Sequence, residues 1–352
     1  MMKYLFKILK IVLFFGACFV FYVLGVIVFG TLTQHNFENV IRLSDHKGGN
    51  TYVNDSTFEF LSWNVGFFGL GEESDFFYDG GNDVFQTKET IHKNMDGVIN
   101  FINQHSSIDF FLLQEVDSFS WRSQKLNFFE EVRFLDDKYQ SHFALNYASA
   151  FVPIPITNPM GPTYSGLFSM SKFKVKDAYR YDLSTEIIWP KRLFYLKRCF
   201  LIQRIQLKEK ALIVINIHNS AYDKSGQKKD NEMKQLIEFA TAEYANGNYI
   251  VIGGDWNQSA PDYTKFNTPK DYSNARFSVN DIPENWQWIS DVNNPTNRKL
   301  DMPYSKDLSC ISAIDHFLVS PNVKVDSIAV VNMDFKYSDH QPVYLKVSID
   351  DY

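Results

Sequence analysis

The fold of this 352-residue chain is indicated first by residues 211–257, ALIVINIHNSAYDKSGQKKDNEMKQLIEFATAEYANGNYIVIGGDWN. Two runs in this stretch, 211–219 and 248–257, have the length and β-branched composition of strands. Both are apolar on both faces, as expected for a sheet that is covered on both sides. Between them, 228–245 repeats apolar residues at helical spacing: Met233, Leu236, Ile237 and Ala240. The stretch predicts a layered α/β sandwich.

The same pattern extends over most of the chain. A second helix is predicted at 88–105, where one face carries Ile91, Met95, Val98, Ile99 and Ile102. Further apolar runs of strand length lie at 58–65, 108–116, 198–207, 314–320 and 343–349. Strands therefore outnumber helices, and the sequence has no internal repeat.

The N-terminal segment carries no charge from residue 11 to residue 30 and follows three lysines at 3, 7 and 10. About 20 apolar residues are enough for a helix to cross a bilayer. Lysines before the span and few basic residues after it predict a single-pass membrane protein, with residues 1–10 cytoplasmic and the rest extracytoplasmic. A cleaved signal peptide is the alternative, although no clear small-x-small site follows the run. We expect a linker at 31–57 and one catalytic domain at 58–352.

Composition narrows the classes of partner. A formal net charge of −6 and a pI near 5.8 provide no general attraction for a polyanion, so nucleic-acid binding would need a local basic patch. The three cysteines have no spacing that suits a metal site. Two long loops, 66–85 and 150–164, are either the rim of a cleft or ordinary surface loops.

Polar side chains lie at the carboxyl ends of four apolar runs, where α/β folds gather their ligands, and another polar pair opens the last run. Each has an ordinary explanation when taken singly, such as a turn residue, a strand-end charge or a buried core imidazole. Together they predict an active site at one edge of the sheets. These residues are Asn64, Glu115, His218, Asn219, Asp255, Asn257, Asp339 and His340.

Six motifs, in order, resemble those of the endonuclease/exonuclease/phosphatase superfamily, which includes DNase I, exonuclease III-like enzymes, sphingomyelinases and inositol polyphosphate 5-phosphatases. The resemblance covers roughly 58–349. It implies a four-layered α/β sandwich in which helices flank two central mixed sheets. The motifs are SWNV (62–65), LLQEV (112–116), NIHNSAYD (216–223), IGGDWN (252–257), AIDHFLVS (313–320) and YSDHQPVYL (337–345).

The resemblance implies a divalent metal site. Glu115 would be the main ligand, Asn64 would lie nearby as a ligand or a phosphate contact, and Asp339 would lie by the metal. Oxygen donors of this kind suit Mg²⁺, with Mn²⁺ as the alternative. Because neighbouring residues on an extended chain point to opposite sides, we expect Asp339 to face the metal and His340 the phosphate.

The resemblance also implies catalytic roles for five residues. Asp255 would orient or deprotonate the attacking water, and Asn257 would hydrogen-bond the phosphoryl oxygens. Asp315 would pair with His340, whose near-neutral pKa suits proton transfer. His218 is the fifth catalytic residue, and which histidine is acid and which is base stays open.

Two positions argue against the exonuclease III-like AP endonucleases. That branch has no histidine where this chain has His218, and it has an acid where this chain has Gly66. The segment 163–173, TYSGLFSMSKF, resembles another segment of the family, so Tyr164 is expected to border the site.

Three functions remain open. The first is a membrane-tethered, metal-dependent phosphodiesterase or phosphatase acting on a lipid head group or small phosphoester. The second is an exported nuclease of the DNase I type, and the third is a non-catalytic membrane-tethered binding module. The sequence indicates a phosphoester substrate and a membrane contact through residues 11–30, and it indicates no protein partner.

Overall fold

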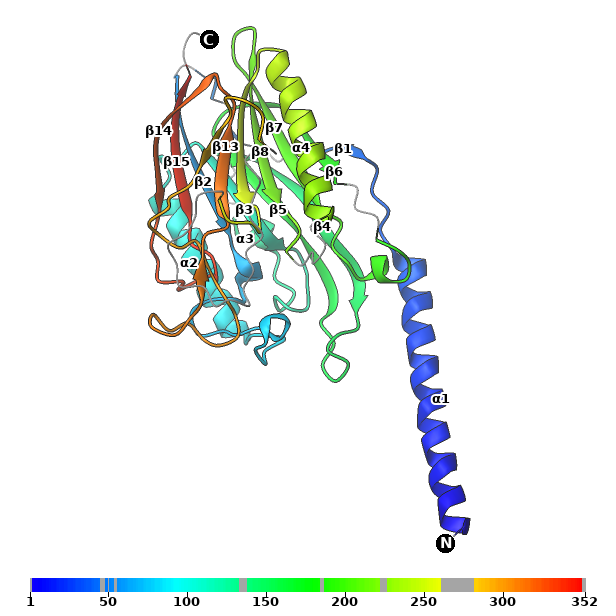
Figure 1. The fold of residues 1–352 in the computed structure, drawn as a ribbon. Helices are drawn as coiled ribbons and strands as arrows, with labels where there is room; N and C mark the ends of the chain where they lie inside the picture. The colour runs from blue at the N-terminus through cyan, green and yellow to red at the C-terminus, as the bar shows by residue number, and fades with distance from the viewer. Residues whose placement is uncertain are drawn as a thin grey trace.

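The computed structural model of the chain describes residues 2–44, 48–49, 51–53, 56–132, 138–183, 187–221, 227–260 and 282–349. Two β-sheets lie face to face, and a long helix projects from one side of this body (Figure 1). The order of layers is helix, six-stranded sheet, seven-stranded sheet, helix. This is the four-layered α/β sandwich that the sequence predicted.

The six-stranded sheet has the order β14-β15-β2-β3-β5-β4. Strands β2 and β3 are parallel, and their neighbours are antiparallel, so the sheet is mixed. The strands are β2 (Thr57–Asn64), β3 (Phe110–Asp117), β4 (Gln140–Val152), β5 (Gly161–Ser171), β14 (Val323–Val330) and β15 (Val343–Ile349).

The seven-stranded sheet has the order β1-β6-β7-β8-β9-β13-β10, and β8 and β9 are parallel strands connected through helix α4. Its strands are β1 (Val40–Arg42), β6 (Val175–Asp182), β7 (Cys199–Gln206), β8 (Ala211–His218), β9 (Tyr249–Asp255), β10 (Gln287–Ile289) and β13 (Asp315–Val319). A two-stranded ribbon is formed by β11 (Asn297–Arg298) and β12 (Ile311–Ser312).

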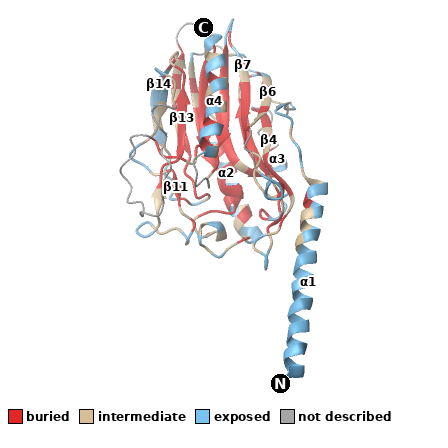
Figure 2. Ribbon diagram, turned by 45° about the vertical axis from the view of Figure 1, so that its right-hand side comes forward, coloured by how far each residue is buried: buried red, intermediate tan, exposed pale blue. Residues whose placement is uncertain are grey.

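The main hydrophobic core lies between the two sheets. Phe60 and Phe110 stack there with ring centroids 4.8 Å apart, and Phe317 of the other sheet packs against Phe60. The strands that cross this core are buried along most of their length (Figure 2). Burial on both faces explains why their sequences are apolar runs rather than alternating patterns.

Two helices complete the outer layers. Helix α2 (Lys88–Gln104) covers the six-stranded sheet with the apolar face that the sequence predicted, and Thr87 caps its first turn through a hydrogen bond from Thr90 N. Helix α4 (Gln227–Ala245) covers the seven-stranded sheet. The shorter helices are η1 (Gly66–Phe68), η2 (Phe77–Asp79), α3 (Phe128–Glu131) and η4 (Lys191–Leu193).

Four substantial strands did not stand out in the sequence: β4, β5, β6 and β14. Strand β5 has the sequence GPTYSGLFSMS, in which Ser and Gly are buried because they fit between closely packed neighbours. Strands β4 and β5 also take up both ends of 150–164, which leaves 153–160 as the connecting loop of a hairpin.

Helix α1 (Met2–Thr33) is long and apolar enough to cross a membrane by length and composition. Its last turn rests on the domain, where Trp189 Nε1 donates a hydrogen bond to Thr31 Oγ1 at 3.2 Å. Within 31–57, strand β1 pairs with β6 and so attaches the segment after α1 to the edge of the seven-stranded sheet.

Candidate active site

Three adjacent strand ends of the seven-stranded sheet bring three site residues together. The parallel register of β8 and β9 pairs His218 with Asp255. The antiparallel register of β9 and β13 pairs Asp255 with Asp315. All three are buried, so the backbone pairing of this sheet brings them to one edge, which we call the candidate catalytic edge.

The facing sheet contributes Asn64 at the end of β2 and Glu115 near the end of β3. Asn64 Nδ2 donates to Asp255 Oδ2 at 3.0 Å and to Glu115 Oε1 at 3.3 Å, and so connects the two sheets across the site. Glu115 has a φ of 53°, and the pairing of β3 with β5 shifts register between Leu113 and Val116. This irregularity lets Glu115 project to the site while its neighbour Gln114 lies buried between the sheets.

The Asp339–His340 step enters from the loop before β15. Ser338 Oγ donates to Asn64 O at 2.7 Å, and Trp63 Nε1 donates to His340 O at 2.9 Å, so this loop is fixed to β2. The expectation that Asp339 and His340 point to opposite sides is wrong. Their side chains lie 3.8 Å apart, because residues 337–339 form bends instead of an extended strand.

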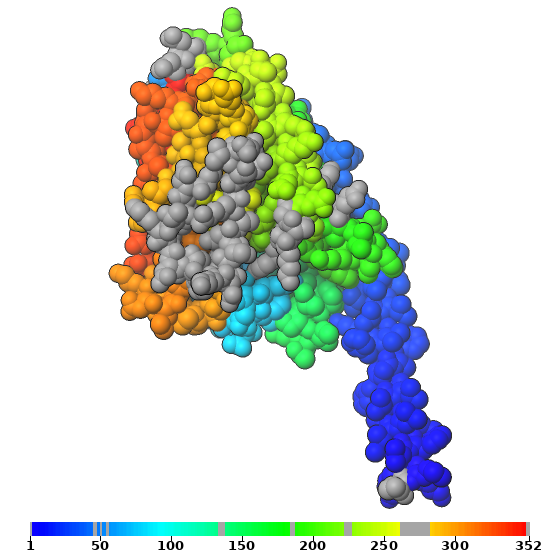
Figure 3. Space-filling view, in the orientation of Figure 1, coloured from blue at the N-terminus to red at the C-terminus, as the bar shows by residue number. Residues whose placement is uncertain are grey.

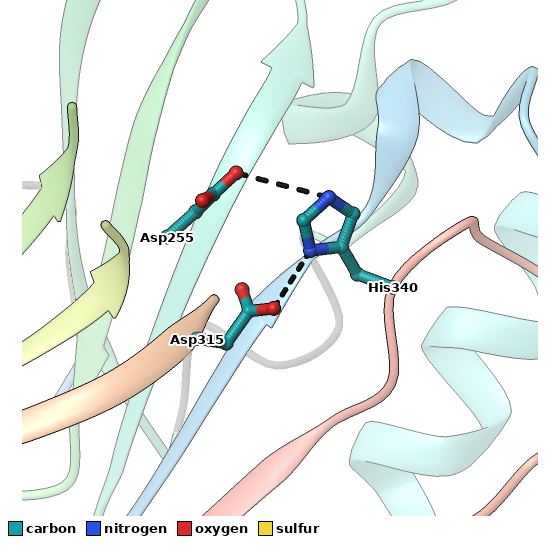
Figure 4. A group of neighbouring side chains, drawn as sticks. All are labelled: Asp255, Asp315 and His340. Carbon is teal, nitrogen blue, oxygen red and sulfur yellow. Dashed lines mark hydrogen bonds and ion pairs between the residues drawn. The ribbon is translucent and has the colours of Figure 1, made fainter. Parts of the chain in front are cut away.

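His340 and Asp315 form a hydrogen-bonded pair (Figure 4). The distance from His340 Nδ1 to Asp315 Oδ2 is 2.8 Å, and His340 Nε2 lies 3.7 Å from Asp255 Oδ2. Burial disfavours a charged imidazole, but the carboxylates of Asp315, Asp339 and Asp255 outweigh it and raise the pKa of His340 well above its ordinary value. These carboxylates therefore favour the protonated form of His340.

Asn297, in β11, lies beside His340. Its Nδ2 is 3.0 Å from His340 Nε2, and the backbones of the two residues pair as in an antiparallel sheet. The same Nδ2 donates to Asp339 O at 3.4 Å, and Asn297 Oδ1 accepts from Ser312 Oγ at 3.2 Å. Asn297 was missed by the sequence analysis, since a lone Asn in PTNRK carries no motif.

His218 has the opposite character. Its Nε2 lies 3.4 Å from Asp255 Oδ2 and 3.9 Å from Glu115 Oε1. Burial, together with the nearby charges of Arg198, His340 and Arg122, moves its pKa well below the ordinary value. The surroundings of His218 therefore favour its neutral form, whereas those of His340 favour its protonated form.

Two acids of the site hold protons unusually tightly. Burial, together with the charge of Asp315, raises the pKa of Asp255 to about 6. Burial and the charge of Glu115 raise the pKa of Asp339 to about 7. Carboxylates crowded in this way repel one another and are stabilised by a cation placed between them.

Two sets of residues have the chemistry of a cation site. Asp255, Asp315 and His340 offer ligand atoms within 4.8 Å of one another, but the His340–Asp315 hydrogen bond already uses two of these groups. In the second set, Glu115 and Asp339 offer oxygen donors only, whereas Asn64 turns its Nδ2 toward Glu115 and its Oδ1 accepts from Gly66 N at 3.0 Å. The crowding of Glu115 and Asp339 fits a divalent cation in this second set, and oxygen donors are what Mg²⁺ prefers.

Asn257 lies beyond β9 with a φ of 51°. Its backbone N donates to Asp255 Oδ1 at 2.8 Å, and its Nδ2 donates to Asn219 O at 2.9 Å. Asn257 thus orients Asp255 and joins the two strand ends that carry His218 and Asp255. Its contact with a phosphoryl oxygen stays a prediction.

Two further positions singled out in the sequence are Gly66 and Tyr164. The Cβ that Gly66 lacks would lie 2.8 Å from Asp339 Oδ1, so an acid at position 66 could not share this space without displacing Asp339. The ring of Tyr164 packs against His35, just beyond α1, with centroids 5.8 Å apart.

The sequence analysis also missed two buried arginines beside the site. Arg122 makes a two-point ion pair with Asp117 and places its Nη2 3.9 Å from Glu115 Oε2. Its guanidinium lies over the ring of Phe67, 3.9 Å from the centroid. Arg198, directly before β7, is buried close enough to His218 to lower the pKa of that histidine. Among the described residues, Arg198 Nη1 has no hydrogen-bond partner.

A third buried arginine, Arg298, fixes loop 66–85 beside the site. Its Nη2 donates to Gly71 O at 2.7 Å and to Ser74 O at 3.0 Å, and its backbone N donates to Asp339 O. The loop predicted either as a rim or as ordinary surface is therefore packed directly against the residues before β15.

We expect Arg298→Met to lower the free energy of unfolding by about 3 kcal/mol, because it leaves several buried carbonyls without a donor. The exposed Arg42→Met, which breaks a surface ion pair with Asp177, should cost about 0–1 kcal/mol. Denaturant unfolding of both variants in the same detergent provides the comparison. Equal losses would contradict the fixing role of Arg298.

Residues 61–340 match the model of the Endonuclease/Exonuclease/phosphatase family. The match covers most of the chain, and the chain belongs to this family. The fold and the catalytic edge described above agree with that membership. A search of curated proteins finds no match.

Solved structures with similar folds come from several relatives of low sequence identity. One is an endonuclease/exonuclease/phosphatase from Beutenbergia cavernae DSM 12333, with a TM-score of 0.54, 15% identity, and coverage of 84% of this chain and 72% of that one. TDP2 from D. rerio, complexed with single-strand DNA product, has a TM-score of 0.53, 13% identity, and coverage of 84% and 100%. ANGEL2, a 2′,3′-cyclic phosphatase, has a TM-score of 0.55, 14% identity, and coverage of 88% and 99%.

Proposed function

We propose that this protein is a divalent-metal-dependent phosphoester hydrolase that α1 tethers to a membrane, with the domain outside the cytoplasm. The main support is the pairing of His340 with Asp315, which places His340 Nε2 3.7 Å from Asp255 Oδ2. Asn64 and Glu115 of the facing sheet lie beside the same group. Family membership supports phosphoester hydrolysis as the reaction class.

Asn64, Glu115 and Asp339 would hold the cation. When bound, a divalent cation neutralises charge on the phosphoryl oxygens and stabilises the leaving oxygen. The protein supplies the other functions. Asp255 accepts a hydrogen bond from Asn64 and from the backbone of Asn257, and both fix the direction in which its carboxylate faces an attacking water.

His340 and His218 divide the remaining work. His340, charged and held by Asp315, would bind the phosphate and stabilise negative charge that develops on it. His218, neutral and next to Asp255, would hydrogen-bond the phosphate or the water. Two histidines of opposite charge preference thus lie on the two sides of one acid.

A lipid head group or small phosphoester is the substrate class we favour, because the chain carries an apolar N-terminal helix and a net charge of −6. Nucleic acid is the second candidate, since TDP2, a structure of similar fold, was solved with a single-strand DNA product. A binding module without activity is disfavoured by the complete set of acid and histidine positions.

The proposed activity is tested by incubating the full chain in detergent with Mg²⁺ and, separately, with a chelator. The substrates are plasmid DNA, sphingomyelin, inositol phosphates and bis(p-nitrophenyl) phosphate. We expect hydrolysis of at least one phosphoester that the chelator abolishes. A folded protein that hydrolyses none of them with Mg²⁺ or Mn²⁺ would support the binding module.

The proposed topology makes a separate prediction. With Lys3, Lys7 and Lys10 ahead of the span, an alkaline phosphatase fused to the C-terminus should be active, because that enzyme needs an extracytoplasmic location. A green fluorescent protein fused at the same place should be dark. The reverse pair of results would place the domain in the cytoplasm.

A further inference from the structure

The end of α1 is held against the domain by close side-chain contacts. Helix η4 packs on Gly30, where an added Cβ would lie 3.4 Å from Leu193 Cβ and 3.3 Å from the ring of Phe194. Trp189 Nε1 donates to Thr31 Oγ1. The direction in which α1 leaves therefore determines which face of the domain is next to a membrane that α1 spans.

The β4–β5 hairpin lies on that face and is unusually apolar at its tip. Residues 150–164 contain no charged side chain, and Ile156 is 62% exposed, with Ile154 also exposed. Isoleucine is among the residues most often buried, and exposed apolar residues become informative where they form one contiguous surface.

Two aromatic residues extend this surface. Trp121 and Phe119, in the loop after β3, are both exposed. Trp121 N donates to Pro162 O at 2.9 Å, and its ring packs over Gly161, at the base of the hairpin. We call Phe119, Trp121, Ile154 and Ile156 the apolar rim.

The apolar rim lies beside α1 and beside the catalytic edge. Strand β4 contacts the end of α1, and both Figure 1 and Figure 3 show the hairpin next to the helix where it leaves the domain. The loop that carries Phe119 and Trp121 begins just after Glu115 on β3. One surface thus adjoins the proposed membrane helix and the residues that would act on a phosphoester.

The composition near α1 matches a membrane–water interface. Ile188 and Trp189 are exposed next to the last turn of α1, and tryptophan is enriched at the level of lipid head groups. Lys191 and Arg192 follow, and basic side chains are attracted to anionic head groups.

We propose that the apolar rim inserts into the same bilayer that α1 spans, so that the catalytic edge faces the lipid head groups. This inference rests on the proposed membrane tether, and it narrows the substrate to a phosphoester carried by a membrane lipid. We assign the bilayer as the partner of the apolar rim because α1, which contacts β4, is the segment that would enter the bilayer.

The test uses the full chain reconstituted in phosphatidylcholine nanodiscs and labelled with NBD, a fluorophore whose emission shifts to the blue in an apolar environment. Three labelling sites are compared, each in a chain without other accessible cysteines. The native Cys18 reports on α1, Ile156→Cys reports on the rim, and Glu209→Cys reports on the exposed β7–β8 turn at the far end of the sheet.

We expect the probes at 18 and 156 to be blue-shifted and quenched by brominated lipid, and the probe at 209 to show neither effect. A probe at 156 that behaves like the one at 209, while Cys18 is quenched, would overturn the docking and leave the tether intact. An unquenched Cys18 would overturn the tether and the docking with it. If the probe at 156 is already blue-shifted in protein without lipid, and the shift grows with protein concentration, the apolar rim binds a second copy of the chain. That result would overturn the proposal.

Discussion

His340→Ala should lower turnover by about 100- to 10,000-fold, the usual contribution of a positioned acid–base group. The reason is geometric and electrostatic. The imidazole is buried, held by Asp315 at 2.8 Å, and surrounded by carboxylates that raise its pKa, which suits the proposed contact with phosphate. Turnover is measured per folded molecule, on whichever phosphoester the native protein hydrolyses.

Asp315→Asn should cost less than His340→Ala, since it removes the group that orients and charges the histidine but leaves the histidine in place. The double variant should be little worse than His340→Ala alone, because residues that act as one unit are not additive. Losses that add in full would show that Asp315 has a role independent of His340.

A matched control is His92→Ala on α2. This histidine lies outside the site, so the turnover of the variant should be unchanged.

If Asp339 and His340 merely form a polar turn before β15, His340→Ala would lower the melting temperature and leave turnover per folded molecule nearly intact. That result would end the catalytic interpretation of the motif.

Glu115→Gln should abolish metal-dependent turnover and weaken Mg²⁺ binding, because a neutral amide is a poorer ligand for a hard cation than a carboxylate. The fold should survive, since Glu115 is partly exposed and its hydrogen bond from Asn64 can be made to an amide oxygen. Isothermal calorimetry with Mg²⁺ measures the binding, and circular dichroism checks the fold.

The control for this prediction is Glu238→Gln, an exposed position on α4 that forms a surface ion pair with Lys234. Its Mg²⁺ affinity and turnover should match the native protein. An unchanged affinity in folded Glu115→Gln would remove Glu115 from the metal site and favour the Asp255, Asp315 and His340 group instead.

The apolar runs and the two amphipathic helices were readable from the sequence because burial acts on local composition. A strand that is covered on both faces must be apolar throughout, and a helix on a sheet must repeat its apolar residues every three or four positions. Strands β5 and β14 were not predicted from the sequence. Buried Ser and Gly interrupt the apolar run of β5, and exposed polar residues interrupt that of β14.

The site residues were readable as a set because six ordered motifs resemble a known family, and the resemblance also implied the pairing of Asp315 with His340, which the structure holds 2.8 Å apart. That Asp339 lies on the same side as His340 was not readable, because it follows from bends at 337–339. Local strand periodicity predicted the opposite, because it assumes an extended chain.

The charge states of the site were decided by the tertiary structure alone. His218 and His340 have the same ordinary pKa, yet one is shifted down and the other up. The difference comes from their neighbours: burial is joined by cationic groups at His218, whereas carboxylates surround His340. Those neighbours come from strands and loops far apart in the chain, such as Arg198 and Asp315, so no local pattern encodes them.

The sequence by itself thus determined the family, the layers and the identity of the polar residues at the strand ends. The tertiary structure decided the side on which Asp339 lies, the direction in which each histidine pKa is shifted, and the position of Arg122, Arg198, Asn297 and Arg298 around them. The physical reason is that secondary structure and burial depend on nearby residues, whereas electrostatic interactions depend on distance in space, which only the packing of the two sheets establishes.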